Sequence, residues 1–149
     1  MKKSIHLAPA EEVFLQLSRC HYLAQNMTEK MLAPCYLTPV EYNVLRIIQN
    51  SPDISAAEMR KRLFVSAPSI AEIIASLTKK GYLKKERHAK DSRVYQLSLL
   101  PKGEIQIKMA QEVIQDTLCH LKLTDAKLQT IAVALNSLQL SLLQFGYAK

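Results

Sequence analysis

Helix-start signals stand close together in the middle of the chain, and they limit the folds open to it. Thr38 is followed by a proline and then by Glu41, three residues after the threonine. A threonine cap, a proline in the first turn and a glutamate that closes a capping box all favour a helix that begins here. Ser55 and Glu58 repeat the capping box. Two helices are therefore predicted, one ending near residue 50 and one ending at Leu63.

A third start signal at Ser66 opens a helix that is predicted to end at Gly81, because glycine favours the left-handed conformation that closes a helix. After the glycine, residues 82–88 and 94–100 are typical of two strands, the second with alternating polar and apolar side chains. Residues 88–93 are then the tip of a hairpin. A short helix, a tight turn, a second helix and a charged hairpin together predict a winged helix-turn-helix.

Longer helices are predicted on both sides of this central unit, over residues 11–31, 101–121 and from Thr124 onward. The first and last carry apolar residues at alternating spacings of three and four. These residues are Val13, Leu17, Cys20, Ala24, Met27 and Met31, and Leu128, Ile131, Leu135, Leu138, Leu142 and Phe145. We expect the two stripes to pack on a second copy in a two-fold dimer, with packing on each other within one chain as the alternative. The predicted fold class is mainly α, a winged helix-turn-helix with a two-stranded β-hairpin wing and N- and C-terminal dimerisation helices.

Positive charge is concentrated in the central region. The chain has a net charge of +7, and residues 55–93 hold ten lysines and arginines against four acidic residues, a net +6. A basic region on an otherwise neutral scaffold is expected to meet a polyanion such as a nucleic acid. A solvated basic face is the alternative.

Other functional classes lack their sequence features. No apolar run of about 18 residues stands out as a bilayer span, and no apolar core of a signal peptide follows the first lysines, so we expect a cytoplasmic protein without a membrane partner. Cys20, Cys35 and Cys119 are odd in number and far apart, which indicates a reducing compartment. The sequence has no nucleophile–base set, glycine-rich phosphate loop or paired metal ligands. Neither an enzyme nor a cofactor nor a metal is expected.

A set of short motifs spans residues 37–103. They are Leu37-Thr38 with Leu45, Val65-Ser66, Leu77-Thr-Lys-Lys-Gly81-Tyr-Leu, Arg87, Asp91-Ser-Arg93, and Leu99 with Lys102-Gly103. With this order of helices, the chain resembles the multiple-antibiotic-resistance regulators (MarR family) of bacterial transcription. The resemblance implies a single MarR-type domain over residues 1–149. Residues from about 1 to 36 and from 101 to 149 would form the dimerisation helices, and those from about 37 to 100 the winged-helix lobe.

The resemblance also implies a function. It suggests a homodimeric regulator, a repressor in preference to an activator, that binds a pseudo-palindromic operator in double-stranded DNA. Helix 66–80 would enter the major groove and wing 84–95 the adjacent minor groove. The chain departs from the family pattern at Ala71-Glu72, where the family usually has Thr-Arg or Ser-Arg, and at Leu99-Leu100, where it usually has Leu-Thr. The first departure bears directly on base recognition.

The candidate DNA-binding residues come from the outer face of the fourth helix and from the wing. With Ile70, Ile73 and Leu77 facing inward, helical spacing turns the small or charged side chains of this helix outward. The outward residues are Pro68, Ser69, Glu72, Ala75, Ser76 and Lys79. The full candidate set is Ser66, Ser69, Glu72, Ser76, Lys79, Lys84, Arg87, Lys90, Asp91 and Arg93. Ser66 is also expected to cap the helix.

Three of these candidates have a specific predicted role. Glu72 could accept a hydrogen bond from cytosine N4 in the major groove, or it could pair with Lys79 or Lys80 and contact no base. Arg93 is the candidate for insertion into a narrow minor groove, with Asp91 holding its guanidinium in place. An ordinary surface ion pair is the alternative for Asp91 and Arg93.

Regulation has candidates of its own. The resemblance implies a small phenolic or amphipathic effector, for which His21, Tyr36 and Tyr42 are candidates, although packing in the core or at an interface would also explain the two tyrosines. Cys35 lies in an expected loop and is the candidate redox-reactive thiol, whereas Cys20 is expected to be packed and inert. Two rival functions therefore stay open: a winged-helix module that docks on an acidic partner protein, and a cysteine-based redox-sensing regulator.

Overall fold

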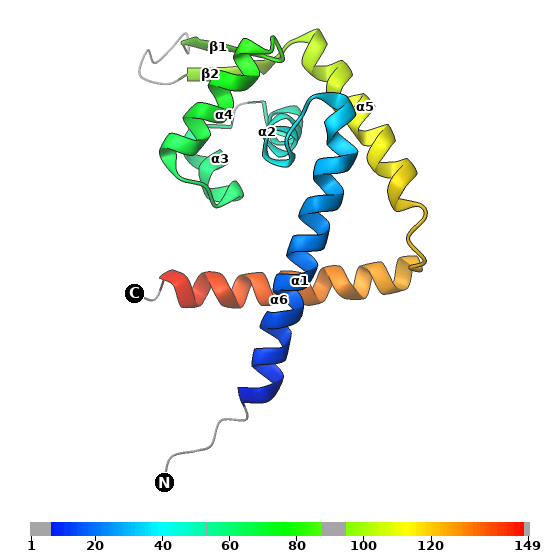
Figure 1. The fold of residues 1–149 in the computed structure, drawn as a ribbon. Helices are drawn as coiled ribbons and strands as arrows, with labels where there is room; N and C mark the ends of the chain where they lie inside the picture. Colours follow the sequence, from blue (N-terminus) through cyan, green and yellow to red (C-terminus); the bar gives the residue numbers. More distant parts are fainter. Residues whose placement is uncertain (1–6, 53, 88–94, 148–149) are drawn as a thin grey trace. The chain divides into compact units, whose positions relative to one another are not determined.

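The computed structural model describes residues 7–52, 54–87 and 95–147. In chain order (Figure 1) the elements are α1 (Leu7–Leu32), the 3-10 helix η1 (Ala33–Cys35), α2 (Pro39–Asn50), α3 (Ala56–Leu63), α4 (Ala67–Lys79), β1 (Leu83–Arg87), β2 (Tyr95–Leu99), α5 (Pro101–Leu118) and α6 (Asp125–Tyr147). The predicted fold class, a mainly helical winged helix-turn-helix with a two-stranded hairpin, is confirmed. The chain divides into two compact units, residues 1–116 and residues 117–149.

The predicted helix starts are confirmed in atomic detail. The Thr38 hydroxyl accepts the backbone N–H of Glu41 at 3.2 Å, and the Glu41 carboxylate accepts the backbone N–H of Thr38 at 2.9 Å. Ser55 and Glu58 form the same reciprocal pair, with both distances 3.2 Å. Each box satisfies two backbone groups that a helix start would otherwise leave without partners. These boxes fix where α2 and α3 begin.

The end of α4 is fixed by Gly81. This glycine has a φ of 73°, in the left-handed region that costs a residue with a Cβ free energy. The N–H of Gly81 donates to the carbonyl of Thr78 at 3.0 Å, and the N–H of Tyr82 donates to the carbonyl of Leu77 at 3.0 Å. This pair of hydrogen bonds is a Schellman motif, and it closes the helix where the sequence predicted. The chain then turns directly into β1.

The hairpin pairs β1 and β2 antiparallel, with Leu83 opposite Leu99, Lys85 opposite Leu97 and Arg87 opposite Tyr95. Because side chains alternate across a strand, Leu83, Lys85 and Leu97 share one face, and Leu83 and Leu97 are buried in the core. Both predicted strands are confirmed, each somewhat shorter than expected. The predicted tip, residues 88–93, lies outside the described residues.

The core of the first unit joins every one of its helices. Its fully buried large side chains are Leu32, Leu45, Ile48, Met59, Leu77, Leu83, Ile107, Val44 and Cys35. Burying one large apolar side chain contributes roughly 1.5–3 kcal/mol, so this cluster holds α2, α3, α4 and the hairpin (Figure 1) together with the end of α1 and the start of α5. The inward stripe predicted for α4 is confirmed, with Ile70, Ile74 and Leu77 buried and Ile73 half-buried.

The helices α1 and α6 have the most uncovered large apolar side chains among the described elements. On α1 the exposed large apolar residues are Val13, Phe14, Leu15, Tyr22 and Leu23. On α6 they are Leu128, Ile131, Val133, Leu135, Leu140, Leu142 and Phe145. Cys20, which the sequence predicted to be packed, is also exposed. On α6, five of the six residues of the predicted stripe are exposed, whereas on α1 only Val13 of the exposed large apolar residues belongs to the predicted stripe, and Met31 of that stripe is buried.

The uncovered helix α6 is long and apolar enough to cross a membrane, which was not expected from the sequence. Within the described residues, Asp125–Gly146 is long enough to span a membrane and has a mean hydropathy of 1.2, and none of it is buried. The prediction that no stretch reaches this length and hydropathy was therefore wrong. Polar residues such as Asn136, Gln139 and Gln144 interrupt the helix, and each would carry an unfavourable transfer into lipid. By length and composition alone, a single helix of this kind is weak support for a membrane protein.

Candidate nucleic-acid interface

The first turn of α4 is held by two serines. The Ser66 hydroxyl accepts the backbone N–H of Ser69 at 3.2 Å, and the two side-chain oxygens are 2.7 Å apart. Ser66 is exposed and Ser69 is half-buried. The predicted capping role of Ser66 is confirmed. The remaining N–H groups of this turn and the positive end of the helix dipole favour an anion at this position.

The exposed face of α4 consists mainly of small side chains. Its exposed residues are Ala67, Pro68, Ala71, Glu72, Ala75, Thr78 and Lys79. A helix with so few long side chains can bring its backbone close to the floor of a groove. The face differs from the predicted one because Ser69 and Ser76 are half-buried, and Ser76 points inward and donates its hydroxyl hydrogen to Glu41 at 2.8 Å. The prediction that Ser76 points outward was therefore wrong.

Glu41 is the buried carboxylate that draws Ser76 inward. Both of its oxygens lie 2.7 Å from the ammonium nitrogen of Lys80, and its side chain is only 5% exposed. Burial raises the pKa of Glu41, but the hydrogen bonds from Lys80, Thr38 and Ser76 together outweigh burial and leave the pKa below its ordinary value of 4.5. The sequence predicted only the cap bond of Glu41, because Lys80 lies 39 residues away and no local pattern links the two.

The same ion pair bears on one alternative for Glu72, a pairing with Lys79 or Lys80. Lys80 is engaged by Glu41, and Glu72 is exposed. In the part of the chain that the structure describes, no ion pair joins Glu72 to Lys79 or Lys80. Glu72 and Lys79 therefore both stand on the outer face, and whether either contacts a base or a phosphate stays a prediction.

The wing presents lysines on both of its faces. Lys84 and Glu86 form an exposed ion pair at 2.7 Å, of the kind that contributes about 0–1 kcal/mol. On the other face the ammonium of Lys85 lies 4.2 Å from the centre of the Tyr95 ring, a cation–π contact that the sequence did not predict. The backbone of Arg87 ends β1. Lys90, Asp91 and Arg93 lie outside the described residues, so their roles remain predictions.

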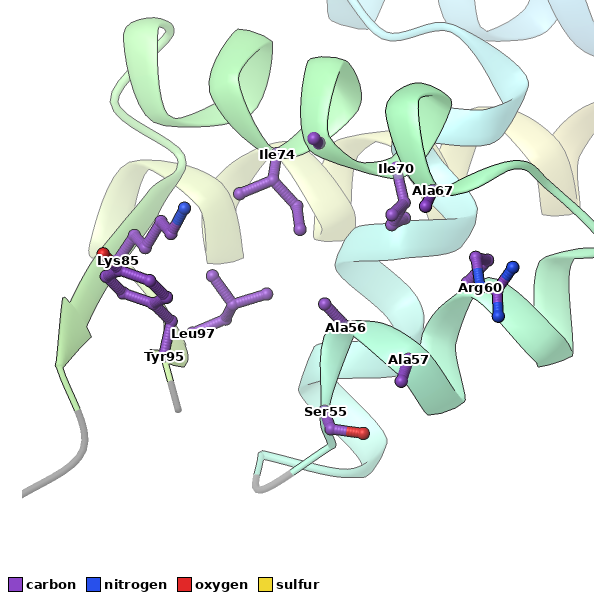
Figure 2. Close-up of a pocket in the computed structure, with 11 residues that line it drawn as sticks. Ser55, Ala56, Ala57, Arg60, Ala67, Ile70, Ile74, Lys85, Tyr95 and Leu97 are labelled. Carbon is purple, nitrogen blue, oxygen red and sulfur yellow. The ribbon is translucent and has the colours of Figure 1, made fainter. Parts of the chain in front are cut away.

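A pocket of about 560 Å³ lies between α3, α4 and the wing (Figure 2). Ile70 and Ile74 of α4 and Leu97 of β2 point into it and are themselves buried. The other lining residues are Ser55, Ala56, Ala57, Arg60, Ala67, Ala71, Lys85 and Tyr95. The space exists because four of these residues are alanines, whose methyl groups cannot fill it. Among the described residues that line the pocket there are two cations and no acid.

The candidate effector residues are not placed around this pocket. His21 and Tyr36 are exposed, the latter by 75%. Tyr42 is half-buried, and its hydroxyl oxygen accepts a long hydrogen bond of 3.4 Å from Arg46. The pocket was not predicted, because its lining residues come from three segments with no shared sequence pattern. The four alanines were the one available signal.

The structure corrects the candidate redox residue. Cys35 is buried, with 1% of its surface exposed, and burial raises the pKa of its thiol above the ordinary value of 9.0. Oxidants and alkylating reagents react with exposed thiolates, so Cys35 is poorly suited to sensing. The error came from placing Cys35 in an open loop, whereas η1 turns its side chain into the core.

Comparisons with known proteins agree with this architecture. A sequence model of the MarR family matches residues 37–94. The HTH-type transcriptional regulator SarZ of Staphylococcus haemolyticus is 30% identical over 80 residues, which is 54% of this chain and 54% of SarZ. The chain thus aligns with a little over half the length of this curated relative.

Two solved structures share the fold at low sequence identity. AbfR in its reduced form bound to DNA is 19% identical, with a TM-score of 0.83 over 97% of this chain and 99% of AbfR. A mutant of E. coli MarR complexed with operator DNA is 17% identical, with a TM-score of 0.79 over 91% of this chain and 99% of that protein. Both likenesses extend through the helices on either side of the central unit.

Proposed function

The chain belongs to the MarR family of transcriptional regulators, and from that premise we propose that it binds operator DNA as a homodimer. In this proposal each copy places α4 in a major groove and its wing, residues 84–95, in the adjacent minor groove. The main support for this proposal is the exposed face of α4, which consists mostly of small side chains. This helix is followed by a hairpin with five lysines and arginines between residues 84 and 93. The α4 face, together with Lys84 and Lys85 of the hairpin, is exposed.

The charges of the wing suit a minor groove. A two-stranded ribbon can project from the protein, and a narrow minor groove has an enhanced negative potential that attracts arginine. Arg93 is the residue we assign to insertion, with Asp91 orienting its guanidinium. Lys84 and Lys79 are exposed and suited to phosphates. Phosphate contacts would supply affinity, while α4 would supply sequence preference.

A second copy of the chain is the partner that best explains the uncovered apolar helices. Single exposed apolar residues are common, but helices whose large apolar residues are mostly uncovered indicate an interaction surface. On α6 even Leu135, near the middle of the helix, is 50% exposed. A two-fold dimer through α1, α5 and α6 would cover these residues. It would also present two copies of α4 to inverted half-sites.

Selection of bound duplexes from a random pool, with the purified chain, tests this function directly. We expect an enriched site of two inverted half-sites separated by about 10 base pairs, which is one turn of the double helix. An asymmetric site would contradict the dimer. A pool that shows no enrichment after several rounds would contradict sequence-specific DNA binding.

We further propose that an effector with an apolar ring body and an anionic group enters the pocket beside α4. Ile70, Ile74 and Leu97 offer an apolar floor (Figure 2), and Lys85 and Arg60 offer positive charge at opposite ends. A volume of 560 Å³ lies in the range of ordinary ligand sites. Because Ala71 belongs both to this pocket and to the exposed face of α4, an occupant would stand where DNA must approach.

Calorimetric titration with 2-naphthoate tests the pocket without DNA. We expect Ala71→Phe to abolish binding by filling the space, and Lys85→Gln to weaken it about tenfold by removing one charge-assisted contact. Lys108 is exposed on α5 and does not line the pocket. It supplies the matched control, so Lys108→Gln should bind like the unaltered chain. Equal binding by Ala71→Phe would exclude this pocket.

One observation favours a second candidate function. Glu72 stands exposed in the middle of the α4 face, and an acid there repels phosphates unless it accepts a hydrogen bond from a base. A winged-helix module that docks its basic hairpin on an acidic protein would avoid this cost. The dependence of affinity on salt separates the two functions, because only duplex binding releases the condensed counterions of DNA.

A further inference from the structure

Lys80 links the end of α4 to the segments where α1, α2 and α5 end or begin. Lys80 caps the C-terminal end of α4. Its ammonium donates to both carboxylate oxygens of Glu41, at the start of α2, and to the backbone carbonyl of Tyr36 at 3.0 Å, just after α1 and η1. Its own backbone carbonyl accepts a hydrogen bond of 3.0 Å from Lys102, in the first turn of α5. One residue thus contacts groups from the ends of α1, α2 and α5.

The partners of Lys80 are themselves held in place. Glu41 accepts further hydrogen bonds from the backbone of Thr38 and the hydroxyl of Ser76. Tyr36 has a φ of 54°, an uncommon conformation for a residue with a side chain, and this conformation persists only where its surroundings fix it. Three acceptor oxygens around one ammonium, two from Glu41 and one from Tyr36, leave it little freedom to turn. The arrangement is stiffer than the usual surface ion pair.

We propose that Glu41 and Lys80 are positioning residues that set the direction of α4 relative to α1 and α5. This inference rests on the proposed function, in which α1 and α5 belong to the dimer and α4 reads DNA. The two copies of α4 must then match two half-sites both in distance and in rotation. Inserting one base pair between the half-sites moves them apart by about 3.4 Å and turns one relative to the other by about 35°. A fixed α4 therefore makes the protein selective for half-site spacing.

The pair is suited to this role because it holds the end of α4 from which the wing departs. Gly81 follows Lys80 directly and turns the chain toward β1. A change in the position of Lys80 would therefore move the recognition helix and the wing together. Loss of the pair should loosen the direction of both while leaving the apolar contacts of Leu77 and Leu83 in place. The expected consequence is tolerance of wrong spacings.

The test measures binding to the selected operator and to duplexes with one or two base pairs added or removed between the half-sites. For each base pair added or removed, we expect the affinity of the unaltered chain to fall about tenfold or more. The affinity of Lys80→Met should fall about threefold or less. Glu41→Gln removes the other partner with little change in volume and should show the same tolerance. Lys79→Met removes an adjacent charge from the outer face, so it should lower affinity equally at all spacings and keep the preference.

Circular dichroism and thermal melting establish that each variant is folded before its binding is measured. If Lys80→Met and Glu41→Gln keep the spacing preference of the unaltered chain, the pair only stabilises the fold and this inference is overturned. If the unaltered chain binds no duplex at any spacing, the proposed function fails, and this inference fails with it. The two failures are distinguishable, because the first requires DNA binding and the second its absence.

Discussion

Gly103 lies against the backbone of Tyr82 so closely that a Cβ on the glycine would stand 2.3 Å from the Tyr82 carbonyl oxygen. The first turn of α5 thereby rests on the chain where it leaves Gly81 and enters β1. The same carbonyl accepts the N–H of Leu100 at 3.0 Å. This contact brings the start of α5 against the base of the wing.

Gly103→Ala should lower the free energy of unfolding by about 2–3 kcal/mol, because a methyl group in a filled space forces the backbone to shift. Gly81→Ala should cost only about 1–2 kcal/mol, since its Cβ would meet ordinary space and only the left-handed backbone is strained. Urea unfolding of both variants measures the difference. Equal losses would mean that α5 can move away from Tyr82 freely.

Glu41 should make stability depend on pH in the acid range. Its pKa in the folded chain is below 4.5, because the hydrogen bonds from Lys80, Thr38 and Ser76 outweigh the opposing effect of burial. The carboxylate of Glu41 therefore contributes fully to the stability of the folded chain above pH 4.5, and this stabilisation is lost as the pH falls through the folded pKa. Above pH 5 we expect Glu41→Gln to be less stable than the unaltered chain by about 1.5–3 kcal/mol, and the gap should narrow toward pH 3.

The informative quantity is the difference in stability between the unaltered chain and Glu41→Gln, and how it changes with pH. Glu58 also has a lowered pKa, through its hydrogen bonds from the backbone and the hydroxyl of Ser55, so Glu41→Gln should still lose stability in acid. A gap between the two proteins that stays constant from pH 7 to pH 3 would show that Glu41 titrates normally. Thermal melts across this range supply the data.

Cys35 should be unreactive in the folded chain. Its thiol is buried and its pKa is raised by that burial, so the thiolate that reacts with alkylating reagents is scarce. Iodoacetamide at neutral pH should label Cys35 only in the presence of denaturant, as read by mass spectrometry. Cys35→Ser should leave any effect of peroxide on DNA binding unchanged. Rapid labelling of Cys35 without denaturant would restore it as a candidate sensor.

Local signals in the sequence predicted most of the fold. The caps at Thr38, Ser55 and Ser66 and the glycine after Lys80 are each read from a few adjacent residues, and all of them are confirmed. The direction of Ser76 was missed, because it depends on a carboxylate 35 residues away. Helical spacing alone places a residue on a helix face and cannot show what covers that face.

The sequence predicted which charged residues of the candidate site are exposed, but not the contacts that form between separate segments. Residues that act through their charge and exposure, such as Lys79 and Lys84, are where the sequence placed them. The stack of Lys85 on Tyr95 and the pocket beside Ala71 depend on how three segments meet. The burial of Cys35 likewise follows from a single turn of 3-10 helix, which no sequence motif predicted.

Arg93 and Glu72 should separate affinity from sequence preference. Arg93→Ala should weaken operator binding by about 1–3 kcal/mol with little change in melting temperature, because the role proposed for Arg93 is a contact with the DNA groove. Glu72→Gln should change the preferred base at one operator position and leave the others unchanged. Binding titrations against a set of single-base variants of the operator measure both effects. A uniform change across all variants for Glu72→Gln would remove its assignment to a base.

The dependence of duplex affinity on salt, measured together with the number of chains bound per duplex, tests the central claim most directly. We predict that two chains bind each operator duplex. We also predict that the logarithm of the association constant falls linearly with the logarithm of salt concentration, with a slope of about −0.9 for each phosphate that the protein contacts. A protein that binds one chain per duplex, or whose affinity for DNA does not respond to salt, would contradict the account.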